Sequence, residues 1–403
     1  MDKDIEQFFA EAPFRFDNSD WLSFCEKAKI KVSSPLIHVA GSNGKSSVCR
    51  ILESVYIAAG YKVASLYDLN LLPLGEGIRW NGNSIEISDF CRLFKENQKL
   101  FAKFSLSAYE MQVAIAYRYF EEIKPDVVIV ESAFGGAYDA TNIDELNTVL
   151  CIVTSSGLTH TNLLGTTTSE IALNHAGILK EECPLLIGKL DENSTDAIRD
   201  FAKKHDSKLS IVDDFHRAHL VGSNYHFDFA PFADLAISTC ALTYINDAAI
   251  ALDGIRRLGP SFPVEEPAIR EGLLDFFLPA RSEAIGNIIL DCASNPEAIK
   301  AFLQGASALC KGKPLHVLFA SERNANIASM LAILGDVSAS INLTTYSSLY
   351  ARDEEDYFLY ISDYPYAGDP LLGLQGLKEK FPEDAILLIG NGEFVMKMRE
   401  ELL

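Results

Sequence analysis

The hydrophobic positions of the chain form short continuous runs that alternate with longer stretches of helical spacing. Two runs rich in β-branched residues, 126–130 and 149–153, are typical of strands buried on both faces of a sheet. Residues 107–120 and 240–258 instead carry apolar side chains at helical spacing. Because strands that alternate with helices build parallel sheets, the pattern predicts an α/β fold.

The pattern repeats near the C-terminus and predicts a second domain there. Short apolar runs at 288–290 and 315–319 indicate two further strands, and an acidic and apolar helix ends near Pro279. A chain of 403 residues is too long for one ordinary hydrophobic core. We therefore expect a larger domain over residues 1–278 and a smaller one over residues 279–403.

One glycine-rich segment has the layout of a phosphate-binding loop. It reads His-Val-Ala-Gly-Ser-Asn-Gly-Lys-Ser-Ser over residues 38–47, after an apolar run at 36–37 and before helical spacing at 48–55. A strand, a glycine-rich turn and a helix in this order present backbone N–H groups to a phosphate. Ala40 stands where the full Walker pattern has its first glycine, so we interpret the loop as a shortened variant.

The side chains of this loop suit a nucleoside triphosphate with magnesium. Gly41 and Gly44 have no Cβ to block N–H groups that point inward. Lys45 can place its ammonium between two phosphates, and Ser46 offers a hydroxyl to the metal. A strand-to-helix turn that contains Gly-Lys-Ser by chance is the alternative interpretation. The residues we expect to bind the nucleotide here are Gly41, Ser42, Asn43, Gly44, Lys45, Ser46 and Ser47.

The loop and several later blocks resemble the folylpolyglutamate synthase and dihydrofolate synthase family, a branch of the Mur ligase superfamily. The later blocks follow in the family's order at residues 131–142, 154–161, 164–165, 176–180, 279–281 and 291–297. The resemblance implies an N-terminal P-loop-type ATPase domain with a mostly parallel sheet, of the Mur ligase central type. It also implies a smaller, Rossmann-like α/β C-terminal domain.

The resemblance implies a reaction as well as a fold. In the family, ATP phosphorylates a carboxylate, the amine of glutamate attacks the acyl phosphate, and inorganic phosphate leaves. We therefore expect an ATP-dependent carbon–nitrogen ligase of folate and one-carbon metabolism, with ATP and Mg²⁺ as cofactors and with a folate or related pterin and L-glutamate as substrates. Polyglutamate extension and dihydrofolate synthesis share these motifs, so both stay open. The alternatives are a Mur-type ligase acting on another carboxylated acceptor and a non-catalytic nucleotide- or pterin-binding relative.

The metal ligands are also carried over from the resemblance. Glu131 and His160 match positions that bind magnesium in the family, and both follow predicted strands. Asp68 stands at the family's magnesium-binding serine. His175 replaces a lysine that is carbamylated to bind a second magnesium, and imidazole cannot carry the carbamate. The expected metal ligands are Ser46, Asp68, Glu131, His160 and His175, and the expected catalytic residues are Lys45, Glu131, His160 and His175.

Other family positions are kept or lost. Arg281 and Asp291 match nucleotide contacts from the second domain, and Asp247 replaces an asparagine that contacts adenine. An arginine and a histidine of the family are lost at Ala137 and Ser294, and nothing in the sequence compensates. The site has therefore either been rebuilt or lost its activity, and the ligand-forming residues at 68 and 175 favour rebuilding.

The segment that ends in Tyr109-Glu110 corresponds to a Phe-Glu segment that helps to form the family's pteridine pocket. Tyr109 could stack on a flat heterocycle, and Glu110 could accept hydrogen bonds from an aminopyrimidine ring. A carboxylate in the first turn of a helix is also favoured by the helix dipole, whatever the ligand. Both interpretations stay open.

The charge and composition limit the partners. A formal net charge of −21 argues against nucleic acid and anionic membranes as partners. No apolar stretch approaches the length needed to span a bilayer, and eight scattered cysteines without a Cys-x-x-Cys pair are typical of a reducing compartment. We expect a cytoplasmic protein and, by analogy with the family, a monomer.

Overall fold

The computed structural model describes residues 3–13, 19–67, 73–158, 161–239 and 241–403. They divide into two compact units. The first contains residues up to 216 together with 228–235 and 246–276, and the second contains 217–227, 236–245 and 277–403. The assignment of functional domains to residues 1–278 and 279–403 stays a prediction.

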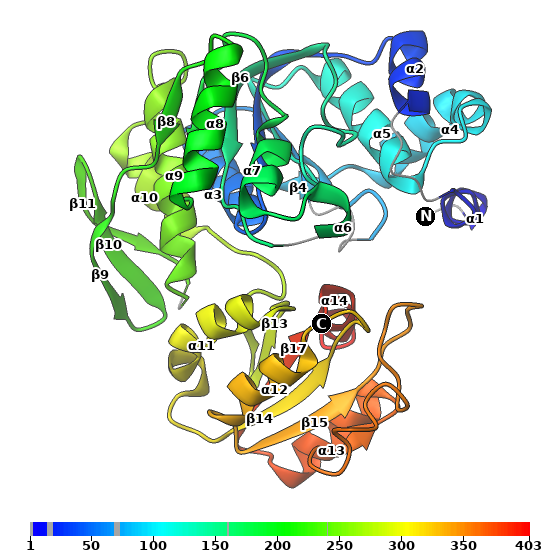
Figure 1. Cartoon of the computed structure of the whole chain (residues 1–403), viewed down its shortest axis with the longest axis vertical. Coiled ribbons are helices and arrows are strands. Elements are labelled where there is room, and N and C mark those ends of the chain that lie inside the picture. Colours follow the sequence, from blue (N-terminus) through cyan, green and yellow to red (C-terminus); the bar gives the residue numbers. More distant parts are fainter. Residues whose placement is uncertain (1–2, 14–18, 68–72, 159–160, 240) are drawn as a thin grey trace. The chain divides into compact units, whose positions relative to one another are not determined.

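The described residues of the first unit form a sheet of eight strands in the order β4-β3-β2-β5-β1-β6-β7-β8. Figure 1 labels β4, β6 and β8 of this sheet. The strands from β2 to β8 in this order are parallel, whereas β3 and β4 form an antiparallel edge. The predicted runs at 126–130 and 149–153 are confirmed as β5 and β6. The bounds are β1 Val32–Ala40, β2 Val63–Leu66, β3 Ile78–Trp80, β4 Asn83–Ser84, β5 Val127–Glu131, β6 Leu146–Val153, β7 Leu185–Ile187 and β8 Leu209–Ile211.

Helices cover both faces of this sheet. The apolar faces of α5, α7 and α8 pack on one side, and α3, α9 and α10 lie on the other, where Gly254 of α9 approaches Ile152 and Leu150. Within the described ranges, no helix has the length and apolar character needed to cross a membrane. The helix bounds in this unit are α1 Lys3–Ala10, α2 Ser19–Ala28, α3 Lys45–Ala58, α4 Ile87–Lys103, α5 Ala108–Ile123, α6 Thr161–Leu164, α7 Thr168–Ala176, α8 Glu192–Lys204, α9 Thr243–Leu258 and α10 Glu266–Leu274.

The register of the central strands brings three chain segments to one edge of the sheet. Strand β1 lies between β5 and β6, with Val39 beside Glu131 and Ala40 beside Val153. Because these strands are parallel, the loop after Ala40 and the residues after β5 and β6 emerge at the same C-terminal edge. Ligands of open α/β sheets bind at this edge.

The second unit repeats the layered design on a smaller scale. Its sheet has the order β12-β13-β17-β14-β15-β16, parallel except for the edge strand β12. Helices α11 and α12 pack on the face that includes Val317 and Leu387. The smaller α/β domain expected from the sequence is confirmed. The bounds are β12 Glu283–Ile285, β13 Ile288–Asp291, α11 Pro296–Cys310, β14 Leu315–Ala320, α12 Ile327–Gly335, β15 Ser340–Thr344, β16 Tyr366–Ala367, α13 Pro370–Lys380, β17 Ala385–Gly390 and α14 Gly392–Glu400.

A small sheet of order β11-β10-β9 was not predicted from the sequence. Its strands are β9 His216–Val221, β10 Asn224–Phe229 and β11 Phe232–Ile237. Most side chains of β9 are exposed, so this strand lacks the apolar run that marks the strands of the main sheets.

Candidate active site

The glycine-rich loop joins β1 directly to α3, as the sequence predicts. Gly41 has a φ of 141° and Gly44 a φ of 85°, conformations that favour glycine. A Cβ on Gly41 would lie 2.1 Å from Thr154 Oγ1, and one on Gly44 would lie 2.3 Å from Asp247 Oδ1. Gly44 is the N-cap of α3, and no described side chain caps this helix. The loop therefore presents a helix N-terminus of the kind that binds phosphate.

The end of β6 fixes the conformation of the loop. The Thr154 hydroxyl donates to the carbonyl of Asn43 at 2.6 Å. Ser155 Oγ accepts from the N–H of Asn43 at 2.8 Å and lies 2.9 Å from its carbonyl oxygen. The N–H of Ser42 donates to the carbonyl of Ser155 at 3.0 Å. These hydrogen bonds within the protein hold the loop against the end of β6.

Lys45 and Ser46 place two different polar groups at the start of α3. The Lys45 ammonium donates to the carbonyl of Gly41 at 2.8 Å, so it lies over the loop. The Ser46 hydroxyl donates to Oε1 of Glu131, the last residue of β5, at 2.9 Å. A hydroxyl and a carboxylate are the hard oxygen donors that suit Mg²⁺. The glycine cradle, the ammonium and this oxygen pair fit a nucleoside triphosphate with magnesium.

Two predicted metal ligands, Asp68 and His160, lie outside the described residues. In the described ranges, no group of three or more His, Cys, Asp or Glu side chains is placed to hold a metal. Of the three predicted ligands among the described residues, Ser46 and Glu131 are in direct contact.

His175 reaches the loop by a different contact. It lies in the last turn of α7 and is 2% exposed. Its Nε2 is 3.3 Å from Ser42 Oγ, which also accepts from the N–H of Gly157 at 2.9 Å. The imidazole thus supports Ser42 of the loop.

Asp247 in α9 lies against the loop, as the short distance from its carboxylate to an ideal Cβ on Gly44 shows. Arg281 and Asp291 belong to the second unit. There Asp291 accepts from the N–H groups of Ser282 at 2.8 Å and Ala293 at 2.9 Å. Burial raises the pKa of Asp291, and the charge of Arg281 opposes this shift.

The positions that lost family residues differ in their surroundings. The N–H of Ala137 donates to the carbonyl of Asn174 at 2.9 Å, and a Cβ on Gly177 would lie 2.4 Å from the Ala137 Cβ. Ala137 therefore packs closely against the end of α7. Ser294 is exposed.

Glu110 and Tyr109 are both occupied by protein contacts. Oε2 of Glu110 accepts from the N–H of Ser107 at 2.7 Å, and the N–H of Glu110 donates to the Ser107 hydroxyl at 3.2 Å, which forms a capping box at the start of α5. Glu110 therefore lies in the first turn of α5, where the helix dipole favours a carboxylate, and its ligand role stays a prediction. The Tyr109 hydroxyl donates to Asp139 Oδ1 at 2.8 Å.

Sequence reasoning did not find a buried polar cluster beside the loop. Nε2 of His38 lies 3.0 Å from Thr141 Oγ1 and 3.1 Å from Ser132 Oγ. Burial, together with the charge of Lys180, lowers the pKa of His38 to about 3, so the ring is neutral. The available signal was a histidine inside an apolar strand.

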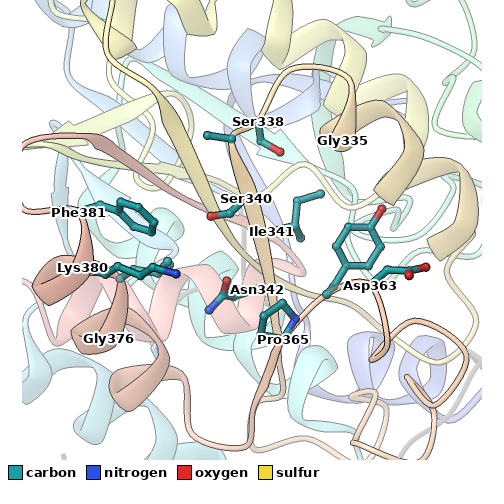
Figure 2. Close-up of a pocket in the computed structure, with 13 residues that line it drawn as sticks. Gly335, Ser338, Ser340, Ile341, Asn342, Asp363, Pro365, Gly376, Lys380 and Phe381 are labelled. Carbon is teal, nitrogen blue, oxygen red and sulfur yellow. The ribbon is translucent and has the colours of Figure 1, made fainter.

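A cavity of about 620 Å³ lies in the second unit, between β15 and the end of α13 (Figure 2). Asn342, Lys380 and Phe381 line it, together with Ser340, whose Oγ lies 2.8 Å from His316 Nδ1. The sequence-predicted site residues are not among those that line this cavity, so we assign it no part in the site.

No family model matches the chain. The dihydrofolate synthase/folylpolyglutamate synthase of Escherichia coli K12 is 32% identical over 302 residues, covering 74% of this chain and 70% of that protein. The protein of the same name from Bacillus subtilis is 26% identical over 387 residues, covering 91% of this chain and 90% of that one.

Solved structures show the same fold along the whole chain. Escherichia coli FolC in complex with DHPP and ADP superposes with a TM-score of 0.87 at 25% identity, over 99% of this chain and 97% of that one. The apo form of the L. casei FPGS gives a TM-score of 0.86 at 22% identity, over 99% of both chains. The fold class inferred from the sequence is confirmed.

Proposed function

Because this chain belongs to the dihydrofolate synthase and folylpolyglutamate synthase family, it is an ATP-dependent ligase that adds glutamate to a folate, and we propose which of its residues carry the reaction. The proposed assignment of the catalytic residues rests on the contact of Ser46, at the start of α3, with Glu131 at the end of β5. The proposed nucleotide-binding residues are Gly41 to Ser47, Asp247, Arg281 and Asp291.

The chain's part in phosphoryl transfer is to position the phosphates and to neutralise their charge. Backbone N–H groups at the start of α3 bind the triphosphate, and the ordered loop holds them in place. When the triphosphate binds, the ammonium of Lys45 leaves the carbonyl of Gly41 and contacts the phosphates. There the ammonium offsets the negative charge that develops on the transferred phosphoryl group.

When bound, magnesium supplies charge that stabilises the transferring phosphoryl group. Ser46 and Glu131 hold it, and Asp68, His160 and His175 complete the proposed set of ligands. His175 has a second role, because its contact with Ser42 supports the loop that binds the phosphates. Aligning the acceptor carboxylate with the nucleotide then allows the acyl phosphate to form, and the amine of glutamate displaces phosphate from it.

Among the folates and related pterins, we propose tetrahydrofolate as the first acceptor to test. We also propose that the protein acts in the cytoplasm, which its scattered cysteines and the absence of a Cys-x-x-Cys pair support. By analogy with the family, we propose that it is a monomer. Size-exclusion chromatography with light scattering tests the oligomeric state.

The test of the function is ADP release with ATP, magnesium and glutamate, with and without tetrahydrofolate, followed by mass spectrometry of the pterin. We expect folate-dependent release and a product one glutamate heavier. Turnover with dihydropteroate assigns dihydrofolate synthesis as well. If the protein turns over only with another carboxylated compound, that compound and not folate is the acceptor. If the protein binds nucleotide but shows no turnover with any acceptor, its function as a ligase is contradicted.

A further inference from the structure

The turn that follows Glu131 is fixed through its backbone N–H groups. The N–H of Ala133 donates to the hydroxyl of Tyr109 at 3.3 Å. The N–H of Phe134 donates to Oδ2 of Asp139 at 2.9 Å. The position of this turn therefore depends on one side chain of α5 and on one buried carboxylate.

Asp139 is the centre of these contacts. It is 4% exposed, and its Oδ1 accepts from the Tyr109 hydroxyl at 2.8 Å. The same oxygen accepts from the N–H of Thr141 at 2.9 Å and from its hydroxyl at 2.6 Å. Burial raises the pKa of this carboxyl, and its hydrogen bonds, including the one from Phe134, oppose that shift. A buried carboxylate needs such donors, so the loss of one weakens the whole arrangement.

The network continues to the strand that leads into the phosphate loop. Because the Thr141 hydroxyl donates to Asp139, it accepts from His38, whose Nε2 therefore carries the proton. The same nitrogen lies 3.1 Å from the hydroxyl of Ser132, the residue directly after Glu131. A continuous chain of contacts thus joins Tyr109 in α5 to His38 in β1.

We propose that Tyr109 is a positioning residue of the nucleotide site, whose hydroxyl fixes the turn after Glu131 and with it the direction of the Glu131 carboxylate. This inference rests on the proposed role of Glu131 in binding magnesium. The hydroxyl is the essential group, because the ring alone offers no oxygen to bridge Ala133 and Asp139. Burial raises the pKa of Tyr109 well above its usual range, so the hydroxyl stays protonated and remains a donor.

The test compares Tyr109→Phe with Tyr117→Phe. Tyr117 lies in the same helix, is fully buried, and donates its hydroxyl to the carbonyl of Thr141 at 2.5 Å. Each variant removes one buried hydroxyl from the same network, but only Tyr109 contacts the turn after Glu131. Any general loss of packing therefore affects both variants.

The experiment measures Mn²⁺ binding in the presence of a non-hydrolysable ATP analogue. Electron paramagnetic resonance detects the free and the bound Mn²⁺. We expect Tyr109→Phe to weaken Mn²⁺ binding by about tenfold, as for other residues that orient a metal ligand, and Tyr117→Phe to change it by less than about twofold. Thermal unfolding should show a similar, small decrease of the melting temperature for both variants. Unchanged Mn²⁺ binding in Tyr109→Phe, or equal weakening in both variants, would overturn the proposal.

The titration needs no turnover, so it separates this inference from the proposed function. If the wild-type protein releases no ADP with any folate, the function fails while the Mn²⁺ titration still decides the role of Tyr109. If Glu131→Gln binds Mn²⁺ as tightly as the wild type, the metal role of Glu131 and the positioning role of Tyr109 both fail.

Discussion

The hydroxyl of Ser46 donates a hydrogen bond to the carboxylate of Glu131 across 2.9 Å, between the first turn of α3 and the end of β5. The two residues are far apart in the chain and meet because β1 and β5 are neighbouring parallel strands. Glu131→Gln keeps the shape and removes the charge. We expect the magnesium concentration for half-maximal ADP release to rise by about tenfold or more, since a carboxylate ligand is lost.

Glu121 offers a control for that variant. It is also a carboxylate held by a serine, because its Oε1 and Oε2 accept from the hydroxyl and the N–H of Ser33, but it lies at the far end of α5. Glu121→Gln should leave the magnesium dependence unchanged. If Glu131→Gln shows the same magnesium dependence as the wild type, Glu131 is not a magnesium ligand.

Gly44→Ala tests whether the phosphate loop needs its close approach to α9. The added Cβ would lie 2.3 Å from Asp247 Oδ1. We expect nucleotide affinity, measured with a fluorescent ATP analogue, to fall by more than about tenfold, with a stability loss of about 1–2 kcal/mol from the positive φ. Gly60 is a close control, because its φ is 86° but an added Cβ would meet nothing within 4 Å. Gly60→Ala should lose stability and keep its affinity.

His175→Ala removes the support of Ser42. One hydrogen bond contributes about 0.5–1.5 kcal/mol, so we expect nucleotide affinity without magnesium to fall by roughly twofold to tenfold. His205, whose Nδ1 contacts the Phe201 carbonyl within α8, provides the control variant His205→Ala. If His175→Ala lowers nucleotide affinity only when magnesium is present, His175 acts through the metal alone. Its proposed role in supporting Ser42 would then be wrong.

Buried His38 makes stability depend on pH. Its pKa is about 3 in the folded protein, below the ordinary value of 6.5, so the unfolded chain binds more protons between these two pH values. Its contribution is complete above about pH 6.5 and is lost as the pH falls towards 3, at up to about 1.4 kcal/mol per pH unit. Urea unfolding at several pH values should show a shallower dependence for His38→Gln. An identical slope in His38→Gln and in the wild type would argue against a neutral buried ring.

The parts of the site that sequence could predict are those that follow local rules. Glu131 and Thr154 end apolar runs, so their place at the sheet edge follows from strand length and parallel topology alone. The contacts of His38 with Ser132 and Thr141 span 94 and 103 residues, and no local pattern encodes them. Glu110 shows the opposite case, because a carboxylate three residues after a serine fits both a ligand and a helix cap until the contacts are known. Strand β9 exposes most of its side chains and lacks the continuous apolar run that marks the strands of the main sheets.

The bonds from Thr154 and Ser155 to Asn43 have a consequence for the reaction cycle. These bonds are made within the protein, so the folded chain itself restricts the loop and bears part of the loop's loss of conformational entropy. If the loop binds the triphosphate as proposed, that part of the entropy loss need not be repeated each time a nucleotide binds.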